Sequence, residues 1–455
     1  MSHITDSTRA AVAAHSSLRP FLLRMHFYIG LFVGPFIFVA ALTGLLYVLT
    51  PQIEDWLYKD ALYTGSTGPA HSLTDQALAA QKALDAGLAV SAVRPPTAPG
   101  GTTRIMFSDP SLGESENRTL FVDPVTLEIR GDLTTYGTSG ILPFRIALDY
   151  LHRSMLMGSL GRYYSELAAS WLWVAVLGGV ALWATGPRRR RAVADMPASQ
   201  RRRWLHSTIG LVLALALLFV SITGLTWSQA GGARIDALRG QLGWVTPSAS
   251  AELAGPAVPV SDHAEHAEHT EHCGHSDPAM RENRLDQLDA VAAAARAGGL
   301  DSPKIEIRLP KPGKAWVVRE YDRSLPTQVD TLAIHPDTME ITSRADFADF
   351  TLIPKLIRWG VDAHMGVLFG WPNQVLMALV AGGLMMMIVY GYRMWWARRP
   401  VAGEPLWQSW RRLSPGQRVL WAALAAGLGW SLPVLGVSLA FFLAVDLLRM
   451  RRVAA

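Results

Sequence analysis

The chain has 455 residues, of which 50% are hydrophobic and 17% are charged, and its formal net charge is +5. This balance is too apolar and too poor in charge for an ordinary soluble enzyme, so we expect several membrane spans. The single cysteine, Cys273, excludes an internal disulfide framework and a four-cysteine iron–sulfur or zinc site. Clusters of arginine flank the apolar runs, which indicates membrane topology rather than binding to nucleic acid.

The first apolar run extends from about Phe27 to Leu49 and has the length of about 20 residues that a bilayer core requires. Arg19 and Arg24 precede this run, and the acidic pair Glu54-Asp55 follows it. The positive-inside rule therefore predicts a cytoplasmic N-terminus, with the residues after the span exported.

The exported segment 51–145 has the pattern of an α+β domain. It begins with a predicted helix from Leu73 to Leu88, and predicted strands follow at Thr103 to Phe107 and Thr119 to Val122. A turn at Asp123-Pro124 leads into another strand.

Three more spans are predicted at about Ser165 to Trp183, Ile209 to Trp227 and Asn373 to Trp395. An amphipathic segment that holds His152 precedes the first of these spans. The apolar tail from Val419 to Leu448 has arginines on both flanks, which is compatible with a helical hairpin or with one long tilted span.

The sequence thus predicts a membrane α-helical bundle with two exported α+β domains. Its segments are a cytoplasmic N-terminus (1–24), span one (25–50), the first exported domain (51–145), an amphipathic segment with span two (146–186), a cytoplasmic basic loop (187–203), span three (204–227), the second exported domain (228–358), span four (359–397), a cytoplasmic loop (398–418) and the C-terminal hairpin or span (419–448).

The opening motif of the first span returns in the third span. Arg24-Met-His26-Phe-Tyr-Ile-Gly30 corresponds to Trp204-Leu-His206-Ser-Thr-Ile-Gly210, which stands 180 residues later. In both copies a Thr-Gly-Leu tripeptide begins 17 residues after the histidine, at Thr43 and at Thr223. An ionisable residue at the start of a membrane span is costly and is a functional-site hypothesis by default.

A second set of matches has an offset of 212 residues. Leu120 to Ile129 matches Leu332 to Ile341, and His152 corresponds in the same way to His364. We interpret the chain as an internal parallel duplication with an insertion of 32 residues in its second half. Parallel repeats place equivalent residues at equal depth, so we expect His26 to face His206 and His152 to face His364.

Two histidines that face each other from neighbouring helices suit bis-imidazole ligation of a haem iron. The four histidines therefore predict two haem b groups, with cations such as Arg24 and Arg153 near the propionates. Asp149 precedes His152 and Asp362 precedes His364 in the sequence. Each carboxylate is a candidate to accept the imidazole N–H of that histidine. On the alternative interpretation, these histidines are structural and the arginines only signal topology.

The inserted segment 262–275 has a low-complexity composition that is typical of metal binding. Its imidazoles and thiol suit a divalent metal in an accessory role. These residues are His263, His266, His269, His272, Cys273 and His275.

The helix-then-strand domains that end in Leu120-Phe-Val-Asp-Pro-Val-Thr-Leu-Glu-Ile129 resemble PepSY domains. With the histidine-bearing spans, residues from about 20 to 400 resemble the PepSY-associated transmembrane helix family of bacterial inner-membrane proteins. Two features depart from the family pattern: His335 stands where the first domain has Asp123, and the His-rich insertion is additional.

The resemblance implies a haem-containing inner-membrane reductase that releases Fe(II) from ferric siderophores, or another Fe(III) chelate, in the periplasm. Some relatives carry a fused flavodoxin-like and NADPH-binding reductase, whereas here we expect quinol or a separate reductase as electron donor. The alternative is a non-enzymatic PepSY membrane protein that regulates a periplasmic peptidase or binds metal. Metal transport ranks last, because Asp446 is the main carboxylate that we find in the apolar segments.

Overall fold

The computed structural model describes residues 18–84, 87–186, 196–253, 284–398 and 406–454, which form two compact units. The first, here named the helical unit, comprises Met1–Tyr47, Tyr150–Ala237 and Val375–Ala455. The second, named the sheet unit, comprises Val48–Asp149 and Leu238–Gln374.

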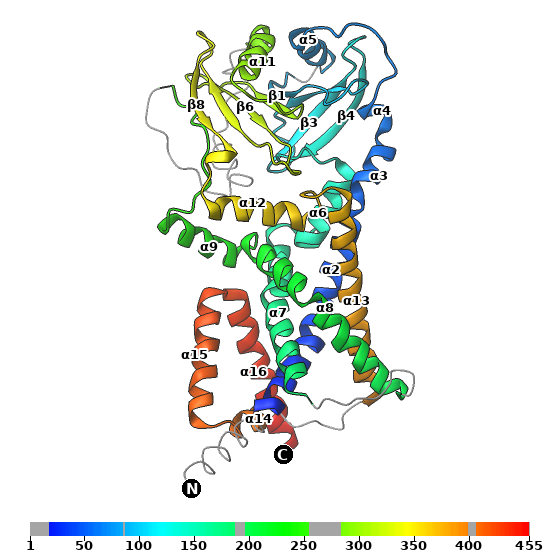
Figure 1. The fold of residues 1–455 in the computed structure, drawn as a ribbon, viewed down its shortest axis with the longest axis vertical. Coiled ribbons are helices and arrows are strands. Elements are labelled where there is room, and N and C mark those ends of the chain that lie inside the picture. The colour runs from blue at the N-terminus through cyan, green and yellow to red at the C-terminus, as the bar shows by residue number, and fades with distance from the viewer. Residues whose placement is uncertain (1–17, 85–86, 187–195, 254–283, 399–405, 455) are drawn as a thin grey trace. The chain divides into compact units, whose positions relative to one another are not determined.

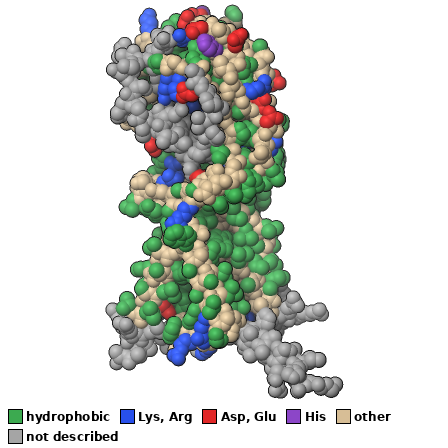
Figure 2. Space-filling model, turned by 90° about the vertical axis from the view of Figure 1, so that its left-hand side faces the viewer, with side chains coloured by type: hydrophobic (Ala, Val, Ile, Leu, Met, Phe, Trp, Pro, Cys, Tyr) green, Lys and Arg blue, Asp and Glu red, His purple; other side chains and the backbone are tan. Residues whose placement is uncertain are grey.

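Within the described residues, four helices are long and apolar enough to cross a membrane, as in a membrane protein. They are Leu18–Val48, α7 (Gly158–Ala184), α8 (Ala198–Thr226) and Trp371–Ala397, the last within α13 (Trp371–Arg398). Each overlaps one of the four predicted spans over nearly its whole length. Hydrophobic side chains cover much of the surface of this unit (Figure 2), as a lipid environment requires.

The first membrane helix is interrupted just after His26. A π-helical segment, η1 (Ile29–Val33), separates the helical residues 18–28 from α2 (Gly34–Val48). Single π-helical turns inside α-helices are frequent at functional sites, because the extra residue redirects the side chains of the preceding turn. The corresponding helix α8 is α-helical throughout.

The apolar tail forms two helices rather than one, α15 (Pro415–Ser431) and α16 (Pro433–Ala454). They pack against each other, and a Cβ added at Gly436 would stand 2.7 Å from the carbonyl oxygen of Gly429. The absence of side chains at both glycines permits this close approach. The helical unit also contains α14 (Leu406–Arg411) and most of α9 (Ala230–Gln241), which runs on into the sheet unit from Leu238.

The sheet unit is built around one antiparallel sheet of eight strands in the order β4-β3-β2-β1-β5-β6-β7-β8 (Figure 1). The strands are β1 (Val90–Arg94), β2 (Thr103–Phe107), β3 (Glu116–Val122), β4 (Ile129–Tyr136), β5 (Ile305–Arg308), β6 (Trp316–Glu320), β7 (Thr331–Ile334) and β8 (Ile341–Ala345).

The two predicted exported domains share this sheet, because β1 pairs with β5. Ala92 lies opposite Arg308, and Val93 lies opposite Ile307. Each half alone would leave a strand edge with unpaired N–H and C=O groups, and the β1–β5 pairing satisfies both edges at once. The sequence analysis did not foresee this joining.

Helices complete the sheet unit. They are α3 (Thr50–Leu57), α4 (Lys59–Leu62), α5 (Leu73–Ala83), α6 (Pro143–Ser154, which runs on into the helical unit), η4 (Leu285–Gln287), α11 (Leu288–Ala297), η5 (Phe347–Asp349) and α12 (Leu352–His364). Helices α5 and α11 contact each other and supply apolar side chains to the same core as the strands.

The strands alternate between an apolar face and a polar face, as the strand period of two dictates. Ile105, Ile307 and Val318 are fully buried in the core that includes α5 and α11. The intervening residues, among them Arg104 and Glu306, belong to the opposite face. That face carries the polar network described below.

Glu54 on α3 is a buried carboxyl, with only 6% of its surface exposed. The backbone N–H of Arg145, near the start of α6, donates to its Oε1 at 3.1 Å. Burial raises the pKa of Glu54 to about 7, although that hydrogen bond and the positive charge of Arg145 oppose the effect.

Glu54→Gln is expected to flatten the dependence of stability on pH. A carboxyl whose pKa is raised by folding contributes stability that is present below about pH 4.5 and is lost as the pH rises through about 7. The wild-type melting temperature should therefore fall between about pH 5 and about pH 8, and that of Glu54→Gln should fall less. The control is Asp60→Asn at an exposed carboxylate of α4, and equal pH profiles for all three proteins would refute the assignment.

Candidate functional site

His26 and His206 lie side by side in the helical unit. His26 stands on the first membrane helix just before η1, and His206 stands near the start of α8. Their ring centroids are 6.2 Å apart, and the ring planes make an angle of 79°. The structure thus brings together the first predicted histidine pair.

Each ring of this pair is oriented by a hydrogen bond to a neighbouring helix. His26 Nδ1 lies 3.0 Å from the carbonyl oxygen of Ala175 on α7, and His206 Nδ1 lies 2.9 Å from that of Met387 on α13. A carbonyl oxygen only accepts hydrogen bonds, so Nδ1 is the donor in both rings. In the neutral imidazole, the lone pair then resides on Nε2, the atom available to a metal.

The two surroundings are equivalent along the chain. Ala175 and Met387 are 212 residues apart, and each is followed four residues later by a glycine, Gly179 or Gly391. A Cβ at Gly179 would lie 3.2 Å from His26 Cε1, and one at Gly391 would lie 3.8 Å from His206 Cε1. A side chain at Gly179 would therefore crowd the imidazole that packs there.

The glycines that stand four residues after His26 and His206 have different surroundings. A Cβ at Gly210 would come within 2.9 Å of Met387 Cε, so Gly210 permits α8 to approach α13 closely. At Gly30, in contrast, a Cβ would have no neighbour within 4 Å among the described residues.

The separation of the His26 and His206 rings would allow both imidazoles to bind one metal ion. Metal–imidazole bonds are about 2.0–2.1 Å long, so two nitrogens on opposite sides of one ion are about 4 Å apart and their ring centroids roughly 6 Å apart. The described residues contain no group of three or more His, Cys, Asp or Glu side chains that could hold a metal ion. If the group is haem, His26 and His206 would be its protein ligands and the porphyrin would supply the other donors.

His152 also has an oriented ring. It lies on the part of α6 that belongs to the helical unit, with Nδ1 2.9 Å from Thr43 Oγ1. The Thr43 hydroxyl donates to the carbonyl oxygen of Val39 at 2.7 Å, so it accepts the proton of His152 Nδ1. A Cβ at Gly44 would lie 3.2 Å from His152 Cε1. The repeated Thr-Gly-Leu tripeptide thus forms, in its first copy, part of a histidine site.

His364 is the last residue of α12 and belongs to the sheet unit. The nearby carboxylate, Asp362, is fully buried and forms ion pairs with Arg323 and Arg358. Because His152 and His364 belong to different units, their pairing stays a prediction. That Asp149 orients the ring of His152, or Asp362 the ring of His364, also stays a prediction.

The two arginines predicted to lie near haem propionates are placed beside tyrosines. Arg24 Cζ lies 5.7 Å from the ring centroid of Tyr28, and Arg153 Cζ lies 5.5 Å from that of Tyr150. Tyr28 in turn donates a hydrogen bond of 2.8 Å to Asp446.

The His-rich segment 262–275 lies outside the described residues, so its metal site stays a prediction.

Glu166 is a fully buried carboxylate on α7 that was not among the predicted site residues. Its two oxygens accept hydrogen bonds of 2.9 Å from the backbone N–H groups of Ala230 and Gly231, at the start of α9. Glu166 therefore satisfies the free donors of a helix N-terminus, where negative charge is stabilised. Its place within an apolar run of α7 was the signal that could have identified it.

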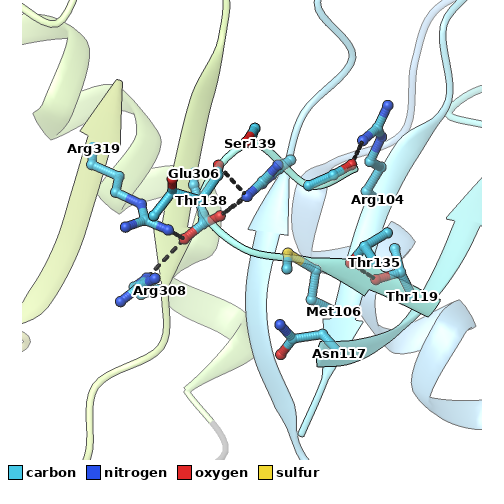
Figure 3. A network of polar contacts seen from close by, with 12 residues as sticks. Arg104, Met106, Asn117, Thr119, Thr135, Thr138, Ser139, Glu306, Arg308 and Arg319 are labelled. Carbon is cyan, nitrogen blue, oxygen red and sulfur yellow. Dashed lines mark hydrogen bonds and ion pairs between the residues drawn. The ribbon is translucent and has the colours of Figure 1, made fainter. Parts of the chain in front are cut away.

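A second group that the sequence analysis overlooked is the arginine network on the polar face of the sheet (Figure 3). Glu306 on β5 accepts from Arg94 on β1 at 2.7 Å and from its neighbour Arg308 at 2.7 Å, and pairs with Arg319 on β6 at 2.8 Å. Burial alone would raise the pKa of Glu306, but these three guanidinium groups hold it well below its usual range.

A sequence model of one protein family, the PepSY-associated TM region, matches residues 23–398. No protein of curated function matches the chain.

Proposed function

The chain belongs to the family defined by the PepSY-associated TM region, and on this basis we propose that it is a haem-containing reductase of the bacterial inner membrane. It passes electrons across the membrane to a periplasmic ferric siderophore or other Fe(III) chelate, and Fe(II) is released for iron uptake. The observation that carries this proposal is the His26–His206 pair, with its 6.2 Å centroid separation and two available Nε2 atoms.

His26 and His206 would hold the iron of one haem b, and His152 and His364 would hold the iron of a second. Bound haem supplies a one-electron carrier inside the bilayer. The protein itself orients the imidazole rings of this pair. The carbonyl oxygens of Ala175 and Met387 accept hydrogen bonds from the Nδ1 atoms of His26 and His206. Arg24 and Arg153 are the cations proposed for the propionates.

We further propose that the fold arose by parallel duplication, with a PepSY-like domain in each half. Two observations support this. The carbonyl partners of His26 and His206 are separated by the same 212 residues as His152 and His364. The strand order is also symmetric about the β1–β5 junction, with four strands from each half.

The proposed topology has the N-terminus and the arginine-rich loops in the cytoplasm and the sheet unit in the periplasm, as the positive-inside rule favours. Electrons then enter from quinol or from a separate reductase. In the periplasm, reduction weakens the binding of iron by the hard oxygen donors of the chelate.

The proposed activity is tested with the detergent-purified protein, reduced with dithionite and freed of excess reductant. Its optical spectrum should show sharp α-bands, which a ferric siderophore should abolish while Fe(II) appears in a chromogenic chelator. The matched control is the gallium(III) form of the same siderophore, which accepts no electron and should leave the bands unchanged. A colourless protein from cells supplied with haem precursors would refute the proposal and favour the regulatory or metal-binding alternative.

A further inference from the structure

The sheet unit contains a cavity of about 240 Å³ on the polar face of the sheet, near the ends of β1 and β2. Two guanidinium groups and the rings of two tyrosines line it, together with small residues of the loop 95–101. The residues on which the argument depends are Asp55, Tyr63, Arg94, Thr97, Arg104 and Tyr321.

Arg94 is almost fully buried, with 1% of its surface exposed. Its Nε donates to Glu306 at 2.7 Å, and its Nη2 donates to the carbonyl oxygen of Thr138 at 2.8 Å. Its third nitrogen, Nη1, has no hydrogen-bond partner among the described residues. A buried donor without a partner costs free energy, and Arg94 is one of the residues that line the cavity.

Arg104 approaches the same point from β2. Its Nη1 donates to the carbonyl oxygen of Gly140 at 3.1 Å. Gly140 has a φ of +60°, and a Cβ there would collide with Arg94 Nη1 and lie 3.4 Å from Arg104 Nη1. The two guanidinium groups therefore converge on one residue that has no side chain.

The positive charge around this cavity exceeds the negative charge. Glu306 is shared by Arg94, Arg308 and Arg319, so it does not balance all of them. Among the lining residues, Asp55 is the only carboxylate, and it is exposed and accepts from the Tyr63 hydroxyl at 3.4 Å. Burial and the neighbouring Arg94 lower the pKa of Arg104, while the charges of Tyr321 and Glu54 oppose this. A bound anion would relieve the repulsion between the two arginines.

We propose that this cavity binds a carboxylate anion and, resting on the function proposed above, that the carboxylate belongs to the Fe(III) chelate. Guanidinium groups form strong charge-assisted hydrogen bonds with carboxylates, and Arg94 and Arg104 both line this cavity. Ligand pockets usually have about 300–1,000 Å³, so this smaller cavity admits one arm of a chelate rather than the whole complex.

The proposal is tested by calorimetric titration of the full-length protein with gallium(III) citrate, iron-free citrate and inorganic phosphate. Gallium(III) is not reduced, so binding is measured independently of electron transfer. We expect gallium citrate to bind, and Arg104→Gln to weaken its binding by about 10-fold to 100-fold through the loss of a charge-assisted contact.

Two further variants keep the test decisive if Arg104→Gln does not fold. Thr97→Trp, at an exposed lining position, keeps both arginines but fills the cavity and should also abolish binding. Arg118→Gln, which removes a surface arginine of the same sheet, should bind like the wild type.

Equal affinity in the wild type and Thr97→Trp would overturn the site, as would preference for phosphate over both citrate forms. Binding of iron-free citrate without binding of gallium citrate would overturn the assignment to a chelate arm. A colourless protein that still binds citrate through Arg104 would support the anion site but contradict its role in the proposed reductase.

Discussion

His206→Ala is expected to remove one of two haem groups and to leave the other bound. The wild-type protein should contain about two haems per chain by pyridine haemochrome, and the variant about one. The physical reason is that, on the proposed assignment, the variant lacks one of the two imidazoles that would hold the iron, and His26 alone would bind it more weakly. His26→Ala should remove the same haem, so the two variants should have identical spectra.

The control for this pair is His71→Ala, which removes an exposed histidine of the sheet unit and should leave both haems in place. Size-exclusion chromatography and circular dichroism separate loss of haem from loss of fold. The variants His152→Ala and His364→Ala are expected to remove the other haem. Full haem content in both His26→Ala and His206→Ala would rule out this pair as the ligands.

Glu306→Gln is expected to destabilise the sheet unit by about 3–5 kcal/mol, because it leaves buried arginines without their shared carboxylate. Glu306 and Arg94 are each 1% exposed, and Arg319 is 15% exposed. At about 2–4 °C per kcal/mol for a unit of this size, the melting temperature should fall by roughly 6–20 °C. Intrinsic fluorescence during heating of the detergent-purified protein measures the shift.

Asp132→Asn provides the matched control for Glu306→Gln. It breaks a carboxylate–arginine pair of comparable length, Arg118–Asp132 at 2.6 Å, whose side chains are 35% and 41% exposed. Exposed pairs contribute about 0–1 kcal/mol, so the control should change the melting temperature only slightly. If the melting temperature fell as much in Asp132→Asn as in Glu306→Gln, burial would not explain the contribution of Glu306 to stability. Neither substitution should change the haem content.

The sequence by itself determined the membrane-spanning helices, the family and the pairing of His26 with His206. The helices follow from the length of uninterrupted apolar runs, and the histidine pair follows from a motif that recurs at constant spacing. The family match over residues 23–398 confirms the resemblance drawn from the histidine-bearing spans and the Leu120–Ile129 motif. Strands such as β2 were predicted correctly because a buried strand has a local pattern of residue types.

Only the tertiary structure decided which backbone groups and charges meet. The β1–β5 pairing joins strands about 200 residues apart, and the polar face carries arginines of β1, β5 and β6 around one glutamate. The contacts of His26 with Ala175 and of His152 with Thr43 likewise join residues that are distant in the chain. Hydrophobic periodicity states which face of an element is buried, but it does not state against which partner. The hydrogen bonds that orient the histidine rings, the shared sheet and the arginine-lined cavity therefore became visible only in three dimensions.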